Sequence, residues 1–197
     1  MTSDPGGRSN AVKTYICRSE DLERNWQTFM ESRGSRLCAA LERLGFSTVS
    51  FADAPKELLG QVYFSPESDY ANSLDPKPFF DVKARNMLYD MSFAAVKNGR
   101  LAAYVLTVGA GKDTAIFEHI SSHKDMQMTG AVLLPFCRSI EEFFRQGMKT
   151  SSYAMYDSNS DAGAFRNKVL SVFDTKCSEV INFIRYPAGA VKEETSV

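Results

Sequence analysis

The sequence predicts an α+β fold in which helices flank a central, mostly antiparallel sheet. The predicted elements follow a mixed order: strand, two helices, strand, helices, three strands, helix, strand, helix and strand. Asn98-Gly99, between two apolar segments, is typical of a type I′ hairpin turn. Gly147 closes a long amphipathic helix in the position of a C-cap. The mixed order indicates the α+β class, and these two landmarks place the remaining elements.

The N-terminal third is expected to alternate short strands with helices. Residues 12–17 alternate and suit a strand, and a helix signature with an acidic first turn begins at Ser19. Apolar residues then recur at helical spacing until Gly45, and Gly34 is expected to divide this run into two helices. A second strand over residues 46–51 follows directly.

The middle of the chain is expected to hold two helices and a meander of three antiparallel strands. The helices are predicted over residues 56–64 and 79–89, with a proline-punctuated surface loop between them. The strands are predicted over residues 93–97, 101–108 and 114–121.

A polar segment then leads into the helix at residues 131–146, with Pro135 in its first turn or kinking it. A strand at residues 151–156, a helix at 164–172 and a strand at 178–186 complete the prediction.

Length and composition fit one compact domain. The 197 residues are enough for a sizeable core, and 44% hydrophobic with 24% charged residues is usual for a globular protein. We expect a single domain over residues 11–187, with flexible tails at 1–10 and 188–197, which are polar, Gly-rich or charged.

Charge, cysteine and hydropathy patterns exclude several classes of function. A net charge of -1 gives no global basic field for nucleic acids or anionic membranes. The four cysteines (Cys17, Cys38, Cys137 and Cys177) include no CxxC pair and the chain has two histidines, so no metal site is predicted and the thiols are expected to be reduced and mostly buried. No window approaches the roughly 18 apolar residues of a membrane span, so we expect a cytoplasmic protein with no membrane partner.

Residues 91–186 resemble the donor-binding half of an N-acyltransferase of the GNAT superfamily, closest to its Fem-type branch, which includes the aminoacyltransferases of peptidoglycan cross-bridges. The likeness lies in the element order, in the basic helix at residues 32–43, and in four short features: Thr129-Gly130-Ala131, Arg145-Gln146-Gly147, Tyr156-Asp157, and Phe165 with Lys168. The chain departs from the family where Arg166 and Asn167 separate Phe165 from Lys168, and it has room for one GNAT domain where Fem-type enzymes commonly have two.

The resemblance implies a donor site at the start of the helix closed by Gly147. The GNAT phosphate loop Q/R-x-x-G-x-G/A lies at a helix N-terminus, where backbone N–H groups and the helix dipole bind anions. Residues 127–132 match its first half, but Val132 stands where a second small residue belongs and is expected to crowd a pyrophosphate. The predicted donor-binding residues are Gln127, Met128, Thr129, Gly130, Ala131, Asn159 and Lys168. No tightly bound cofactor is implied, and the donor is aminoacyl-tRNA or acyl-coenzyme A.

Amide formation also needs a base for the attacking amine and stabilisation of the oxyanion. Glu118 and His119 are adjacent on one strand, so one is expected on each face of the sheet, and whichever faces the cleft is the candidate base. Tyr156 is the candidate acid for the leaving group, and Asp157 the candidate for holding the acceptor amine. In the alternative reading these residues cap loops, form turns or pack beneath the sheet, and His123 is simply exposed.

The sequence therefore predicts a cytoplasmic N-acyltransferase that transfers an aminoacyl group from aminoacyl-tRNA to a primary amine of a small metabolite or natural-product precursor, by direct attack in a ternary complex. A tRNA acceptor arm would follow basic residues of the early helix and the donor half: Arg24, Arg33, Arg36, Arg43, Lys124, Lys149, Arg166 and Lys168. One alternative is an acyl-coenzyme A-dependent GNAT enzyme. The other is a GNAT-shaped binding module without catalysis.

Overall fold

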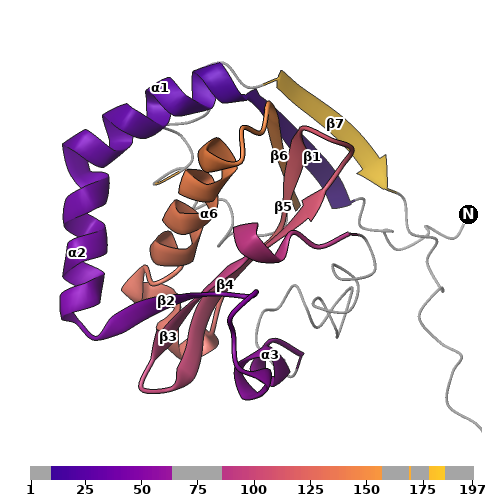
Figure 1. The fold of residues 1–197 in the computed structure, drawn as a ribbon. Helices are drawn as coiled ribbons and strands as arrows, with labels where there is room; N and C mark the ends of the chain where they lie inside the picture. Colours follow the sequence, from indigo (N-terminus) through magenta and orange to yellow (C-terminus); the bar gives the residue numbers. More distant parts are fainter. Residues whose placement is uncertain (1–9, 64–85, 157–168, 170–177, 185–197) are drawn as a thin grey trace, which may run out of the picture.

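The computed structural model describes residues 10–63, 86–156, 169 and 178–184. Within them a seven-stranded sheet has the order β2-β3-β4-β5-β6-β1-β7, and every neighbouring pair is antiparallel except the parallel pair β5 and β6 (Figure 1). The predicted mostly antiparallel α+β sheet is confirmed. The strands are β1 (Asn10–Arg18), β2 (Phe46–Ser50), β3 (Phe93–Lys97), β4 (Arg100–Gly109), β5 (Thr114–Ser122), β6 (Thr150–Tyr156) and β7 (Ser178–Ile184).

The N-terminal strand β1 lies between the two C-terminal strands, a position that the sequence did not predict. Val12 is paired with Tyr156 of β6 on one side and with Asn182 of β7 on the other. The first strand of the chain therefore attaches β7 to the rest of the sheet.

The first long helix bends without a break. It runs through α1 (Ser19–Phe29), the π-helical segment η1 (Met30–Gly34) and α2 (Ser35–Arg43), and Figure 1 shows α2 turned sharply away from α1. Gly34 was predicted to divide two helices. Instead it ends a π-helical turn, a known cause of helix bending, and its backbone stays helical. Gly45, with φ 85°, ends the run as predicted.

The predicted hairpin of β3 and β4 is confirmed. Asn98 and Gly99 have positive φ values of 52° and 73°, as a type I′ turn requires. The register between the strands shifts after Ala95, which leaves Ala102 as an extra residue on β4.

Residues 86–92 correct the predicted helix at 79–89, of which residues 79–85 lie outside the described residues. Asn86 has φ 70°, Met87 forms an isolated bridge with Val108, and a short 3-10 helix, η2 (Tyr89–Met91), follows. The buried Ser92 hydroxyl accepts a hydrogen bond from the Thr107 amide at 2.9 Å and donates to the Leu88 carbonyl at 2.8 Å. The Thr107 contact joins the segment to β4.

The two faces of the sheet carry separate cores. The α6-side cluster lies beneath α1, α2 and α6 (Leu133–Arg145), and includes Trp26, Phe29, Leu41, Phe117, Phe136, Ile140 and Phe143. The α3-side cluster lies beneath α3 (Lys56–Tyr63), and includes Phe51, Leu58, Val62, Tyr104, Leu106 and Val108. Figure 1 shows α6 inside the angle formed by α1 and α2.

The helix α6 agrees closely with its prediction. Pro135 is its third residue, in the first turn, where a missing N–H is tolerated. Gly147, with φ 68°, ends it. Of the helix predicted at residues 164–172 only Val169 is described, and the tail at 188–197 lies outside the described residues.

Candidate donor and acceptor site

The strands β5 and β6 separate part-way along their length. Their parallel pairing comprises the four pairs from Thr114↔Thr150 to Phe117↔Tyr153. Beyond this point β5 continues to Ser122 and β6 to Tyr156, and within the described residues no strand is paired between them. We call this opening the β5–β6 wedge. Its facing backbone groups can hydrogen-bond an extended ligand as an added strand would.

A β-bulge lies where the wedge begins. On the β4 side, Leu106 is paired with His119 and Thr107 with Phe117, so Glu118 is the extra residue. A bulge leaves one residue out of the ladder and redirects side chains, and bulges are frequent beside active sites. Glu118 therefore lies immediately after the last residue of β5 that is paired with β6.

This bulge removes the basis for expecting Glu118 and His119 on opposite faces. Phe117 and Ile120 both pack in the α6-side cluster, although unbroken alternation would place residues three apart on opposite faces. His119 is opposite Leu106, a member of the α3-side cluster, and directly opposed residues of an antiparallel pair share a face. The register therefore places His119 on the α3 face, whereas alternation no longer determines the direction of Glu118. Both side chains are half-buried.

A buried phenol lies on the same face as His119. Tyr104 is opposite Ser121 in the register and forms a side-chain hydrogen bond with it. Burial raises the pKa of Tyr104 to about 12, against the opposing effect of the Ser121 hydrogen bond. Tyr104 thus remains a neutral hydroxyl near neutral pH. On this face it is diagonal to His119, because Tyr104 is opposite Ser121 and Leu106 is opposite His119.

The polar loop after β5 is held to the sheet at its start and is internally hydrogen-bonded. The His123 amide donates to the Ala102 carbonyl at 2.8 Å, and His123 Nδ1 accepts from the Asp125 amide at 3.3 Å. His123 thereby caps the 3-10 helix η3 (Lys124–Thr129), rather than being simply exposed. Thr129 Oγ1 donates to the Met126 carbonyl at 2.6 Å.

The start of α6 has little amide capacity left for an anion. The Leu133 and Leu134 amides donate to the Gly130 and Ala131 carbonyls at 2.9 and 3.2 Å, and Pro135 has no N–H. The Ala131 amide donates to Thr129 Oγ1 at 3.2 Å. An open helix N-terminus would offer these groups to a phosphate.

The side chains of this loop are packed to different degrees. Val132 is partly buried against the α6-side cluster, and its expected crowding of a donor phosphate stays a prediction. Ala131 is fully buried in that cluster, which leaves only its backbone for a donor. Met128 is 98% exposed, and Gly130 has the left-handed φ of 73°.

The other predicted site residues are only partly described. Gln127 lies in η3, and Tyr156 ends β6 beside the wedge. Asp157, Asn159 and Lys168 lie outside the described residues, as does Arg166. The structure therefore places Glu118, His119 and Tyr156 on the two strands that border the wedge.

The exposed arginines of the bent helix make local contacts. Arg24 pairs with Asp21 at 3.7 Å, and Arg33 lies over the Phe29 ring at 5.5 Å. Two more bind backbone carbonyls of their own helix at 2.6 and 3.3 Å, namely Arg36 and Arg43. Of the residues in the predicted tRNA path, the structure describes the side chains of these four arginines and of Lys149.

A separate polar hollow of about 400 Å³ lies at the other end of β6 from the wedge. Its lining combines acidic and basic groups: Arg18, Ser19, Glu20, Glu23, Lys149 and Thr150. Its location at the paired end of β6 separates it from Glu118 and η3. Among the described residues, no group of three His, Cys, Asp or Glu side chains could hold a metal ion. None of the helices in the described part of the chain is long and apolar enough to span a membrane.

No protein-family model matches the chain, and no curated protein matches its sequence. Solved structures do match. The ribosomal-protein-S18-alanine N-acetyltransferase from Escherichia coli has a TM-score of 0.50 and 21% identity, over 63% of this chain and 76% of that chain. A tandem GNAT protein from the clavulanic acid biosynthesis pathway has a TM-score of 0.57 and 14% identity, over 93% of this chain and 58% of that chain. The chain has the GNAT fold.

A third matching structure is the C-terminal domain (DUF2156) of a protein from Agrobacterium fabrum that is named a putative lysylphosphatidylglycerol synthetase. Its TM-score is 0.51 at 13% identity, over 90% of this chain and 62% of that chain. This chain thus spans less than two thirds of two of these three structures. The predicted GNAT fold is confirmed, and the Fem-type branch stays a prediction because these matches show the fold alone.

Sequence reasoning missed two features near the β5–β6 wedge. A bulge that needs no glycine leaves no mark in the sequence, and Glu118 is flanked by ordinary strand residues. The other feature is long-range: β1 pairs with the opposite edge of β6 along seven residue pairs, far apart in the sequence.

Proposed function

We propose that this chain is an N-acyltransferase that joins an activated acyl group to a primary amine by direct attack. The observation that carries the proposal is the coincidence of three features at one place in a GNAT fold. The β5–β6 wedge opens after Phe117, the bulge lies at Glu118, and the loop before α6 closes the same end of β5.

The wedge would hold the donor by its backbone. An extended acyl carrier would lie between the diverging strands β5 and β6 and hydrogen-bond to their backbones, and its carbonyl would then lie near the bulge. Backbone N–H groups beside the bulge would stabilise the oxyanion that forms when the amine attacks. Pre-set donors of this kind account for a large part of acyl-transfer catalysis.

Proton transfer falls to residues of the two strands that border the wedge and to Asp157. We propose Glu118 or His119 as the base that removes the proton from the amine nitrogen. Tyr156 would return a proton to the leaving oxygen or sulfur, and Asp157 would hold the amine. If His119 is the base, the acceptor amine would lie on the α3 side of the sheet, the face on which the register places His119.

Aminoacyl-tRNA remains our preferred donor. The amides at Ala131, Leu133 and Leu134 are already bonded within the protein and Pro135 has none, so a tightly cradled pyrophosphate is poorly supported. A fold match named for lysylphosphatidylglycerol synthesis is consistent with aminoacyl chemistry on this fold. We place the acceptor among small metabolites or natural-product precursors, and a cytoplasmic location accompanies this donor.

Acyl-coenzyme A is the second candidate donor. Two observations favour it: Val132 is partly buried against the α6-side cluster, and Gly130 carries no side chain and has open space around its Cα. A non-catalytic binding module is the remaining alternative.

The test measures ligand-induced thermal shift and product formation with a charged tRNA mixture and, separately, with acyl-coenzyme A, each with a panel of primary amines. A shift and amide product with charged tRNA support the proposed donor. The same result with acyl-coenzyme A alone replaces that donor with the second candidate. Absence of product with both donors contradicts the enzymatic proposal, and binding without turnover favours the module.

Variants identify the residues involved. Glu118→Gln and His119→Gln should each leave folding intact, and the one that removes the base should lower kcat by about 100-fold or more. Lys112→Gln, an exposed change in the turn at the paired end of β5, is the matched control and should keep wild-type kcat. If both Gln variants keep wild-type activity, the assignment of the base is refuted.

A further inference from the structure

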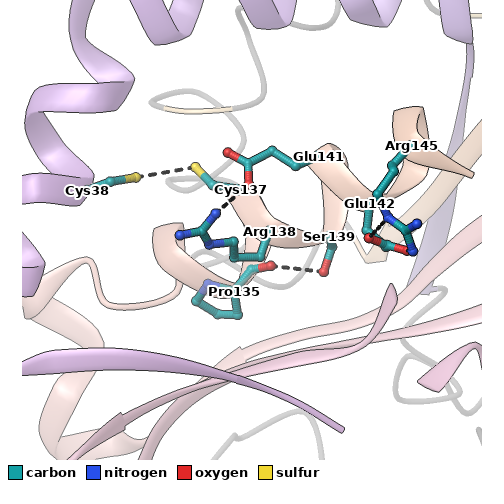
Figure 2. A network of polar contacts seen from close by, with 8 residues as sticks. All are labelled: Cys38, Pro135, Cys137, Arg138, Ser139, Glu141, Glu142 and Arg145. Carbon is teal, nitrogen blue, oxygen red and sulfur yellow. Dashed lines mark hydrogen bonds and ion pairs between the residues drawn. The ribbon is translucent and has the colours of Figure 1, made fainter. Parts of the chain in front are cut away.

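Two cysteines that are far apart in the sequence meet between α2 and α6. The Sγ atoms of Cys38 and Cys137 are 3.6 Å apart, although 99 positions separate them in the chain. Figure 2 shows the Cys38 side chain directed from α2 toward Cys137 on α6. Neither thiol belongs to the wedge or to the proposed acyl transfer.

The two thiols differ in access to solvent. Cys137 is 3% exposed and lies within the α6-side cluster, whereas Cys38 is only half-buried. A small oxidant can therefore reach Cys38 first, with Cys137 directly behind it. This is the usual arrangement of a reacting cysteine and a resolving cysteine.

The surroundings lower the pKa of the Cys38 thiol. The hydrogen bond that it shares with Cys137 holds the pKa of Cys38 below its usual value, with a smaller contribution from the positive charge of Arg138. Burial of Cys38 and the carboxylates of Glu141 and Glu42 oppose this shift. The same thiol pairing, together with burial, raises the pKa of Cys137. Arg138 also donates to Glu141 at 2.9 Å, as Figure 2 shows, so part of its charge is shared.

The sulfurs are close to the distance of a disulfide bond. A disulfide needs an S–S distance of about 2.05 Å, roughly 1.5 Å less than the present separation. Each cysteine has one side-chain rotation that moves its sulfur, and Cys38 lies on the more exposed helix. Rotation of the two side chains and an approach of α2 to α6 would bring the sulfurs to bonding distance.

We propose that Cys38 and Cys137 are a redox modification site, which a hydroperoxide converts to a disulfide that links α2 to α6. The Cys38 thiolate attacks one peroxide oxygen, and the O–O bond breaks, giving a sulfenic acid on Cys38 and releasing the other oxygen as water after protonation. Cys137 then attacks the Cys38 sulfur, and the hydroxyl leaves as a second water. Two thiols and one hydrogen peroxide thus give one disulfide and two waters, and the peroxide is the oxidant.

The link would restrain the helix that follows the candidate donor loop. Cys137 is in the second turn of α6, which begins at Leu133 directly after the loop containing Gly130. Joining α2 to this turn closes a long chain loop, which stabilises the folded state chiefly by restricting the unfolded one. Oxidation should therefore raise the melting temperature in a manner that a reductant reverses.

The experiment treats the fully reduced chain with a stoichiometric amount of hydrogen peroxide, followed by intact mass, non-reducing peptide mapping and thermal melting. We expect a mass loss of about 2 Da, since two hydrogens are removed. The map should join the peptides that contain Cys38 and Cys137. The melting temperature should rise, and dithiothreitol should restore the original value.

Variants keep the outcome decisive even if a substitution changes basal stability, because each protein is compared with itself before and after oxidation. Cys38→Ser should show neither the cross-link nor the reversible rise in melting temperature, and Cys17→Ala should show both. A gain of about 16 or 32 Da without a cross-link would overturn the proposal. A cross-link to a different cysteine or a covalent dimer would also overturn it. So would thiols that stay unoxidised after peroxide treatment, provided that iodoacetamide shows Cys38 to be accessible.

Discussion

Gly34 lies where the bent helix widens, and Gly34→Ala is expected to destabilise the protein. A Cβ at this position would lie 2.6 Å from Met30 Sδ and 2.6 Å from Phe29 Cε1. The Met30 thioether can move aside, but Phe29 is 1% exposed and fixed in the core. Overpacking of this degree costs about 2–3 kcal/mol, and the higher helix propensity of alanine offsets about 1 kcal/mol. The net loss of about 1–2 kcal/mol corresponds to a melting temperature lower by roughly 2–8 °C for a domain of this size.

Gly60→Ala is the matched control, because this glycine is also helical and nothing lies within 4 Å of its added Cβ. It should raise stability by up to about 1 kcal/mol through helix propensity and a less flexible unfolded chain. Urea unfolding of both variants gives the comparison directly. If Gly34→Ala proves as stable as Gly60→Ala, the close packing at the π-helical turn is not what requires glycine there.

Three further predictions concern the sheet. Ser92→Ala should cost about 1–3 kcal/mol in urea unfolding, since it leaves the buried Thr107 amide and Leu88 carbonyl without their hydroxyl partner; an unchanged midpoint would contradict this. Gly99→Ala should cost about 1 kcal/mol, because Gly99 has φ 73°, and thermal melting measures the loss. The pKa of Tyr104 is about 12 in the fold and about 10 when unfolded. Its contribution is therefore complete below pH 10 and declines by about 2–3 kcal/mol toward pH 12. Tyr104→Phe should lack this decline, and parallel alkaline unfolding curves would refute it.

Local chemistry in the sequence determines much of the fold. Asn98 and Gly99 accept positive φ and so predict the hairpin, and Gly147 does the same for the end of α6. Alternation and helical spacing correctly predict β1, β2, α3 and the meander. The prediction failed at residues 86–89, where helical spacing of apolar residues was overridden by pairing of Met87 with Val108.

The candidate site was less accessible from sequence because it depends on pairing between distant segments. His119 is on the α3 face only because a register shift precedes it, and that shift is visible only against β4. Val132 was expected to crowd a donor phosphate, and nothing in the sequence indicated that it would also pack against the α6-side cluster. Likewise, four widely spaced cysteines gave no sign that Cys38 and Cys137 would approach within 3.6 Å.

The location of β1 between β6 and β7 governs when the sheet can be completed during synthesis. Residues 10–18 leave the ribosome early, yet their partners are residues 150–156 and 178–184. Until those segments are synthesised, β1 lacks the hydrogen-bonding partners of both its edges. Unpaired strand edges of this kind promote aggregation. Such long-range pairing also slows folding through the entropy of closing a large loop. Chaperone dependence and temperature-sensitive yield on expression are therefore expected consequences of this strand order.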